Sequence, residues 1–297
     1  MLRRVMQYIK NPHLLARGER VLVCVSGGAD SIALLDVMLR GGFDCIVAHC
    51  NFHLRDKESD RDELFVRNHP LISENQRAIP LLVEHFDTVS YAQANHCSIE
   101  VAARQLRYQW FDQVAREYSC QAIAVAHHQN DQAETVILNL KRGTGLRGLC
   151  GMRAKSSNPI VDSTVPIIRP LLCTTHQYIC HYLRDIRHLQ WVEDSTNTDT
   201  TFTRNSIRQE IQHYTQSEIE HIATTAEHLQ GYLDWIEKRD SEAAQQVQLY
   251  EQLREYHFPE PEKIYRALKS NVGGKTFISP THKVTIKKGK LCITSES

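Results

Sequence analysis

The chain has 297 residues, and its 35 Lys and Arg residues are balanced by 35 Asp and Glu residues. Hydrophobic residues make up 41% of the sequence and charged residues 24%, which is typical of a soluble globular protein and excludes a collagen-like or fully disordered chain. Because the formal net charge is zero, any nucleic-acid surface must be local. The length favours about two domains.

The cysteines are nine in number and none belongs to a C-x-x-C pair. Their spacing therefore indicates neither a disulfide framework nor a zinc or iron–sulfur site, and we expect a reducing compartment. Residues 1–10 (MLRRVMQYIK) are charged and lack the apolar stretch of a signal peptide, and no run reaches the length of a membrane span. We expect a cytoplasmic protein without membrane contact.

Four short apolar runs alternate with helical patterns in the first half of the chain. The runs are residues 20–25, 44–48, 81–86 and 121–126. The helical patterns cover residues 31–39, 58–68, 98–118 and 131–141, and Ser98 is the expected N-cap of the third. Continuous β-branched runs that alternate with helices predict βαβ units and a parallel sheet. The first half is therefore expected to be α/β.

The second half is mainly helical in pattern. Residues 174–189 predict a helix, and residues 209–257 combine helical spacing with 10 acidic residues against 3 basic ones. Residues 258–297 carry 8 Lys or Arg against 3 acids, and the segment KVTIKKGKLCIT predicts a hairpin that turns at Lys288 and Gly289. This basic tail fits a solvated face and an RNA contact equally well. We predict one domain over residues 1–210 and a smaller one over residues 211–297.

The strongest motif is SGGADS, which lies between the first predicted strand and the first predicted helix. Glycines there let the backbone approach a phosphate, and the helix N-terminus offers N–H groups to an anion. The segment lacks the lysine of a Walker A loop and the spacing of G-x-G-x-x-G. We predict that it binds a nucleotide, and that Asp30 holds Mg²⁺ or orients the nucleotide. The predicted nucleotide-binding residues are Ser26, Gly27, Gly28, Ala29, Asp30 and Ser31.

This segment resembles the PP-loop (SGGxDS) of the ATP pyrophosphatase superfamily. Those enzymes cleave ATP between the α and β phosphates and adenylate a carbonyl-type oxygen. The resemblance implies a parallel-sheet, adenine nucleotide alpha hydrolase-like domain of the α/β class, followed by a smaller helical domain with a short β tail. It also implies ATP and Mg²⁺ as cofactors.

Further segments are similar to motifs of the tRNA(Ile)-lysidine synthase family, in the same order over roughly residues 18–210. AHHQNDQAET at residues 126–135 resembles A-H-H-x-D-D-Q-x-E-T, with Asn130 where the family usually has Asp. Weaker matches are EVAARQLRY from Glu100, HCNFHLR from His49, KRGTGLRGL from Lys141, RPLL from Arg169, and the segments 191–197 and 204–208.

The resemblance assigns roles to individual residues. The implied catalytic residues are Asp30, Arg107, His127, Asp131 and Glu134. Of these, Asp131 and Glu134 lie one turn apart on one helix face and are expected to recognise lysine or accept a proton. Contacts to substrate or tRNA are expected from Arg104, Arg142, Arg147, Arg204 and Arg208.

The implied reaction joins L-lysine to the isoleucine tRNA that carries a CAU anticodon. ATP would adenylate O2 of the wobble cytidine, and the lysine ε-amine would then attack C2 and expel AMP, giving lysidine. The sequence leaves open whether two copies form a homodimer.

Two alternatives are a PP-loop tRNA thiolase and a non-catalytic nucleotide- or RNA-binding module on the same fold. A thiolase is expected to show catalytic cysteines or C-x-x-C pairs. A non-catalytic module is expected to lose the acids near the loop, whereas Asp30, Asp131 and Glu134 are all present. An amidotransferase such as asparagine synthetase is not expected, because it needs a glutaminase domain.

Overall fold

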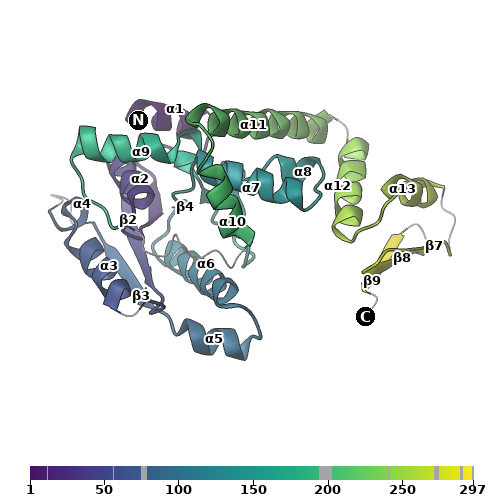
Figure 1. Ribbon diagram of the computed structural model, residues 1–297, viewed down its shortest axis with the longest axis horizontal. Helices are drawn as coiled ribbons and strands as arrows, with labels where there is room; N and C mark the ends of the chain where they lie inside the picture. Colours follow the sequence, from purple (N-terminus) through teal and green to yellow (C-terminus); the bar gives the residue numbers. More distant parts are fainter. Residues whose placement is uncertain are drawn as a thin grey trace. The chain divides into compact units, whose positions relative to one another are not determined.

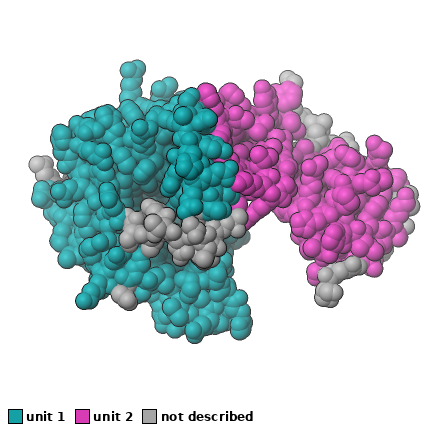
Figure 2. Space-filling model, in the orientation of Figure 1, with its two compact units in different colours: residues 1–132, 153–220 teal, residues 133–152, 221–297 magenta. Residues whose placement is uncertain are grey.

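The computed structural model describes residues 1–11, 13–55, 57–74, 79–193, 203–239, 241–270, 274–287 and 290–295. The chain forms two compact units, shown in teal and magenta in Figure 2. Unit 1 comprises residues 1–132 and 153–220, and unit 2 comprises residues 133–152 and 221–297. Residues 133–152 thus join the C-terminal residues in unit 2, and the sequence-based domain boundary at residue 210 stays a prediction.

Unit 1 is built on a six-stranded sheet in the order β3-β2-β1-β4-β6-β5. Its strands are β1 (Arg20–Cys24), β2 (Asp44–Asn51), β3 (Leu81–His85), β4 (Ala122–Ala124), β5 (Lys155–Ser156) and β6 (Ile167–Ile168). All neighbours pair in parallel except β5, which runs antiparallel to β6. The predicted parallel sheet and its four strands are confirmed. The sequence analysis missed β5 and β6, because two residues are too few to show a period.

Helices cover both faces of this sheet (Figure 1). Since side chains alternate along a strand, Val21 and Val23 of β1 join the apolar core under α2, whereas Leu22 joins the core under α6. Ser98 caps α6 as predicted, because its hydroxyl accepts the Val101 N–H at 3.3 Å. The helices of unit 1 are α1 (Leu2–Lys10), α2 (Ala29–Arg40), α3 (Lys57–Asn68), α4 (Pro70–Ser73), α5 (Thr88–Ala94), α6 (Ile99–Glu117), η1 (Pro170–Cys173), α9 (His176–His181), η2 (Tyr182–Arg187) and α10 (Thr203–Ile211).

Unit 2 combines helices with a small antiparallel sheet. Its elements are α8 (Leu146–Leu149), α12 (Ser241–Glu255), α13 (Pro261–Lys269), β7 (Thr276–Ile278), β8 (His282–Lys287) and β9 (Lys290–Ser295), with most of α7 (Gln129–Lys141) and α11 (Gln216–Arg239). The predicted hairpin is confirmed as the β8–β9 pair, and its turn at Lys288 and Gly289 lies outside the described residues. Leu253, Phe258, Ile264 and Val284 form a buried core. Across the described residues, we find no helix with both the length and the apolar character to cross a membrane.

A buried carboxylate anchors α2, the helix that follows the SGGADS loop. Asp36 is fully buried and accepts hydrogen bonds from the Tyr182 hydroxyl and from Nε and Nη2 of Arg187. Arg40 donates to the same tyrosine oxygen at 2.8 Å. Because these partners belong to α2 and η2, the network fixes the two segments to each other.

We expect Asp36→Ala to lower the free energy of unfolding by about 3 kcal/mol, because the Arg187 guanidinium and the Tyr182 hydroxyl lose a buried acceptor. Urea denaturation followed by circular dichroism measures the change. The control is Asp44→Ala, which breaks the exposed 2.7 Å pair with Arg20 and should cost less than about 1 kcal/mol. Equal losses in the two variants would contradict this role for Asp36.

Candidate functional site

Two segments far apart in the sequence meet at one edge of the sheet. The SGGADS loop follows β1, and residues 127–131 follow β4. These strands are parallel neighbours, with Leu22 paired to Ile123, so both segments leave the sheet at its carboxyl edge. In the sheet, β2 and β3 lie on one side of β1, whereas β4 lies on the other side. The strand order therefore reverses between β1 and β4. Ligands of open α/β sheets bind in the crevice at such a reversal.

The Ser31 hydroxyl organises the loop. It accepts the main-chain N–H groups of Ser26 and Gly27, both at 3.2 Å, and donates to the Gly28 carbonyl at 2.9 Å. Gly27 has a φ of +98°, a left-handed conformation that favours glycine. The loop therefore holds its shape through its own hydrogen bonds.

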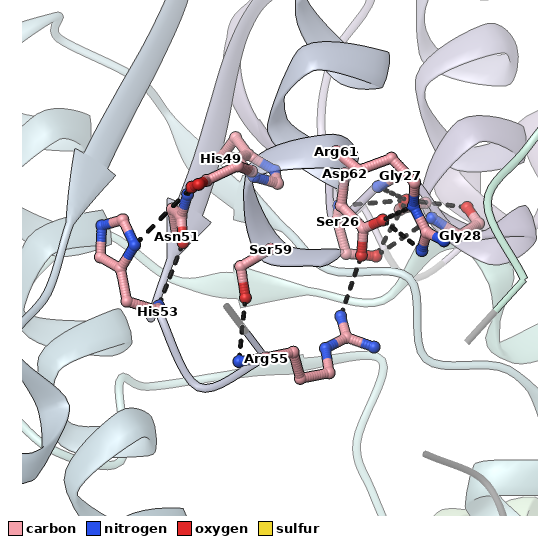
Figure 3. A network of polar contacts seen from close by, with 12 residues as sticks. Ser26, Gly27, Gly28, His49, Asn51, His53, Arg55, Ser59, Arg61 and Asp62 are labelled. Carbon is pink, nitrogen blue, oxygen red and sulfur yellow. Dashed lines mark hydrogen bonds and ion pairs between the residues drawn. The ribbon is translucent and has the colours of Figure 1, made fainter. Parts of the chain in front are cut away.

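Neighbouring elements brace the loop on the side of β2 and α3. His49 donates from Nδ1 to the Val25 carbonyl at 2.8 Å, and burial lowers the pKa of His49, so this histidine is a neutral structural group. A Cβ at Gly27 would lie 3.4 Å from the Val66 side chain of α3. In Figure 3, Asp62 of the same helix accepts hydrogen bonds from Arg55 (3.0 Å) and Arg61 (2.8 Å).

Asp30 is shared by two histidines. Its Oδ1 lies 2.8 Å from Nδ1 of His176, and its Oδ2 lies 3.5 Å from Nε2 of His128. His128 Nε2 is also 3.4 Å from Asp131 Oδ2, which accepts the His128 main-chain N–H at 2.9 Å. Because the Asn130 N–H donates to His128 Nδ1 at 3.2 Å, we assign the ring proton to Nε2, between the two carboxylates.

The charges in this cluster stabilise one another. Burial alone would raise the pKa of Asp30, but hydrogen bonds from His128 and His176 hold it well below its usual range. The hydrogen bond to Asp30 raises the pKa of His176 to about 10, and the Cys180 sulfur, 3.4 Å from Nε2, acts in the same direction. Asp30 and His176 therefore form a carboxylate–imidazolium pair at neutral pH.

The sequence analysis named some of these residues and missed others. Asp30 and Asp131 come together, but the imidazole between them belongs to His128, whereas the predicted catalytic histidine is His127. No motif in the sequence points to His176, which Asn130 positions by accepting its main-chain N–H at 3.0 Å. The catalytic role of His127 stays a prediction, as does that of Glu134, which lies one helical turn after Asp131.

Comparison with known proteins identifies the family. Residues 1–215 match the PP-loop domain, and residues 235–296 match the TilS substrate binding domain. A tRNA(Ile)-lysidine synthase of Parabacteroides distasonis is 40% identical over 99% of this chain and 70% of its own length. The chain belongs to the tRNA(Ile)-lysidine synthase family. These are PP-loop enzymes that modify tRNA.

Other lysidine synthases match over shorter stretches. The protein of Bacteroides thetaiotaomicron is 46% identical over 69% of this chain and 45% of its own length. That of Porphyromonas gingivalis is 44% identical over 79% of this chain, so the chain spans about half of these two relatives. The solved U34-tRNA thiolase NcsA from Methanococcus maripaludis has a TM-score of 0.57 at 18% identity over 77% of each chain, which shows a shared fold.

The two arginines of α6 that match lysidine synthases contact different aromatic rings. Arg104 and Arg107 are both exposed. The guanidinium of Arg107 lies 5.0 Å from the ring centre of Phe52, which follows β2, and that of Arg104 lies 5.0 Å from the ring centre of Tyr108. Their predicted substrate contacts stay predictions.

The other arginines that were predicted to contact substrate or tRNA are divided between the two units. In unit 2, Arg142 is exposed and Arg147 forms an ion pair with Glu237. Arg208 lies on α10 in unit 1. The Arg204 side chain and the residues 194–197 lie outside the described part of the chain.

Packing within the protein explains at least one glycine of the segment KRGTGLRGL, which begins at Lys141. A Cβ at Gly145 would lie 2.1 Å from the Glu251 carboxylate, which accepts the Arg147 main-chain N–H at 3.2 Å. A side chain at position 145 would therefore displace that carboxylate from its hydrogen bond. Gly145 alone is thus no evidence for a phosphate contact.

A cavity of about 870 Å³ lies away from the lysidine synthase motifs. Its lining includes Glu19, Phe43 and Gln121, which directly precede β1, β2 and β4. It therefore lies at the amino edge of the sheet, opposite the loop. The candidate site is assigned by strand topology and chemistry rather than by cavity volume.

We expect His176→Gln to destabilise the ligand-free protein by about 1 kcal/mol near pH 6, an effect limited by solvent screening of the half-exposed pair. The pKa of His176 is about 10 in the folded state and about 6.5 in the unfolded state, so its stabilisation is complete below about pH 6.5 and is lost as the pH rises towards 10. The depressed pKa of Asp30 predicts a loss at acid pH, below about 4.

Urea denaturation of wild type and variant across this pH range measures the difference. The matched control is His228→Gln, an exposed position on α11. A difference that stays constant between pH 6 and 10 would rule out the ion pair.

Proposed function

We propose that this chain is an ATP-dependent ligase that attaches L-lysine to the wobble cytidine of the isoleucine tRNA with a CAU anticodon. The observation that carries the proposal is the preformed SGGADS loop beside the Asp30–His128–Asp131 cluster, in a chain of the lysidine synthase family. The loop supplies a phosphate site, and the cluster supplies groups that hold or accept protons.

The loop is suited to the phosphates of ATP. Gly28 has an ordinary φ of −73°, and a Cβ there would meet no protein atom closer than 3.6 Å. The protein's own conformation therefore does not require glycine at this position, whereas close approach of a phosphate does. The N-terminus of α2 adds main-chain N–H groups and a positive dipole end.

Asp30 fits the magnesium ion that accompanies ATP. Mg²⁺ is usually held by one or two carboxylates together with substrate phosphates, and Asp30 offers a charged carboxylate within the loop. The two histidines use only part of the hydrogen-bonding capacity of its oxygens. When bound, the ion would offset negative charge on the phosphates.

The proposed chemistry has two displacements. First, O2 of the cytidine attacks the α phosphorus, and the bond from that phosphorus to pyrophosphate breaks. The neutral ε-amine of lysine then attacks C2, the C2–O2 bond breaks and AMP leaves with the oxygen. Asp131 is our candidate for the group that accepts the proton of the amine, and Glu134 for recognition of lysine. His128, hydrogen-bonded to Asp131 through its main chain, keeps that carboxylate in place.

Three buried thiols of the α/β unit do not favour the thiolase alternative. Burial raises the pKa of Cys45 and of Cys50 to about 12, and that of Cys120 to about 11. These sulfurs stay protonated at neutral pH, whereas a sulfur nucleophile must be a thiolate.

The direct test is incorporation of radiolabelled L-lysine into a CAU-anticodon isoleucine tRNA transcript with ATP and Mg²⁺. Label on this transcript with release of AMP, and none on a transcript with U at the wobble position, is the expected result. Retained ATP binding without any label on the CAU transcript would refute the proposed substrate.

Asp131→Asn should abolish lysine incorporation, with a loss of at least about 100-fold, because an amide cannot accept the proton. The fold should persist, since the amide oxygen can still accept the His128 N–H. The control is Asp185→Asn, an exposed position that pairs with His181. An Asp131→Asn enzyme with wild-type turnover would remove Asp131 from the mechanism.

Gly28→Ala should weaken ATP binding at least about 10-fold while leaving the unfolding temperature nearly unchanged, because the methyl group occupies space reserved for a phosphate. Isothermal titration calorimetry measures the affinity. The matched control is Gly231→Ala on α11, where a Cβ meets nothing within 4 Å. Unchanged ATP affinity in Gly28→Ala would exclude close phosphate contact at this residue.

A further inference from the structure

Arg169 lies at the same sheet edge as the nucleotide loop. It directly follows β6, which pairs in parallel with β4 on the side away from β1. Two strand spacings therefore separate the ends of β1 and β6, roughly 10 Å.

The Arg169 guanidinium is buried and only partly satisfied. The residue is 8% exposed, and Nη1 donates to the Arg153 carbonyl at 2.8 Å and to the Ser156 hydroxyl at 3.0 Å. Nε is buried and has no hydrogen-bond partner. Within the described ranges, no carboxylate forms an ion pair with Arg169. The two groups that accept its hydrogen bonds are a main-chain carbonyl and a hydroxyl, and both are neutral.

A buried cation without a counter-ion is unfavourable in a protein interior. Burial lowers the pKa of Arg169, yet a guanidinium stays protonated at neutral pH. The free protein thus holds a buried cation that an anion would stabilise.

The geometry of the guanidinium indicates the kind of anion. Nη1 donates to the Ser156 hydroxyl of β5 and to the main-chain carbonyl of Arg153, which lies just before β5. The Nε–Nη2 edge is left for another acceptor. That edge presents two parallel N–H donors, which match two oxygens of one phosphate group. A lysine ammonium carries its donors on one nitrogen and would not provide this planar fork.

We propose that the Nε–Nη2 edge of Arg169 binds a phosphate group of a substrate. The inference rests on the proposed function for the source of that phosphate, which is either ATP or the RNA backbone. In both cases the ligand supplies a counter-ion that the described residues do not provide.

The test compares wild type, Arg169→Met and Arg169→Lys as full-length chains, with Arg3→Met on the exposed face of α1 as the control. Affinities for pyrophosphate, ATP and the CAU-anticodon tRNA transcript are measured separately. We expect Arg169→Met to bind one phosphate ligand at least 10-fold more weakly, Arg169→Lys to recover part of that loss, and the control to match wild type.

Stability provides the second measurement. Replacing a buried, uncompensated cation by an apolar side chain of similar size should leave the unfolding temperature of the ligand-free protein unchanged or raise it. Loss of affinity for pyrophosphate and ATP assigns the phosphate to the nucleotide, and loss for tRNA alone assigns it to the RNA.

Affinities that stay within twofold of wild type for all three ligands would overturn the proposal. So would a lower unfolding temperature in Arg169→Met that Arg169→Lys restores without any change in affinity, since that pattern belongs to a structural arginine. If Arg169→Met does not fold, Arg169→Lys decides by the same binding measurements, because it keeps the charge but not the two-donor fork, and wild-type affinity in that variant overturns the proposal. Because these assays read binding, they remain valid even if wild type incorporates no lysine.

Discussion

The parallel pairing of β1 with β4 is the constraint on which the candidate site depends. It brings the loop at residues 26–31 next to residues 127–131, about a hundred positions later in the chain. Val23 of β1 is paired with Ala124 of β4, and both residues are fully buried. Their burial stabilises this register, because a shift by one residue would move their side chains to the other face of the sheet. The core of unit 1 therefore determines which polar groups can meet at the carboxyl edge.

Charge is distributed unevenly along that edge. At the end of β1, the carboxylate of Asp30 is paired with the His176 imidazolium, and His128 lies between Asp30 and Asp131. At the end of β6, no carboxylate of the described residues pairs with Arg169. The edge thus has a paired carboxylate at the loop and, on our proposal, an unpaired cation where an anionic ligand binds.

Features that depend on neighbouring residues were predictable from the sequence, and features that depend on distant ones were not. The SGGADS loop, its flanking strand and helix, and the Ser98 cap follow from local patterns. The contact between Asp30 and His176 spans 146 positions, and only the fold reveals it. Residues 174–189 were predicted as one helix, but the structure passes from α9 into the π-helical η2, because periodicity does not distinguish i+4 from i+5 hydrogen bonding.

The contact between Gly145 and Glu251 links two positions more than one hundred residues apart. The missing side chain at 145 makes room for the carboxylate, and the carboxylate in turn holds the main chain at Arg147. Neither position is free to vary by itself: a larger residue at 145 selects for a shorter one at 251. Among relatives of this chain, the two sites should therefore change as a pair, an evolutionary signature of a single crowded contact.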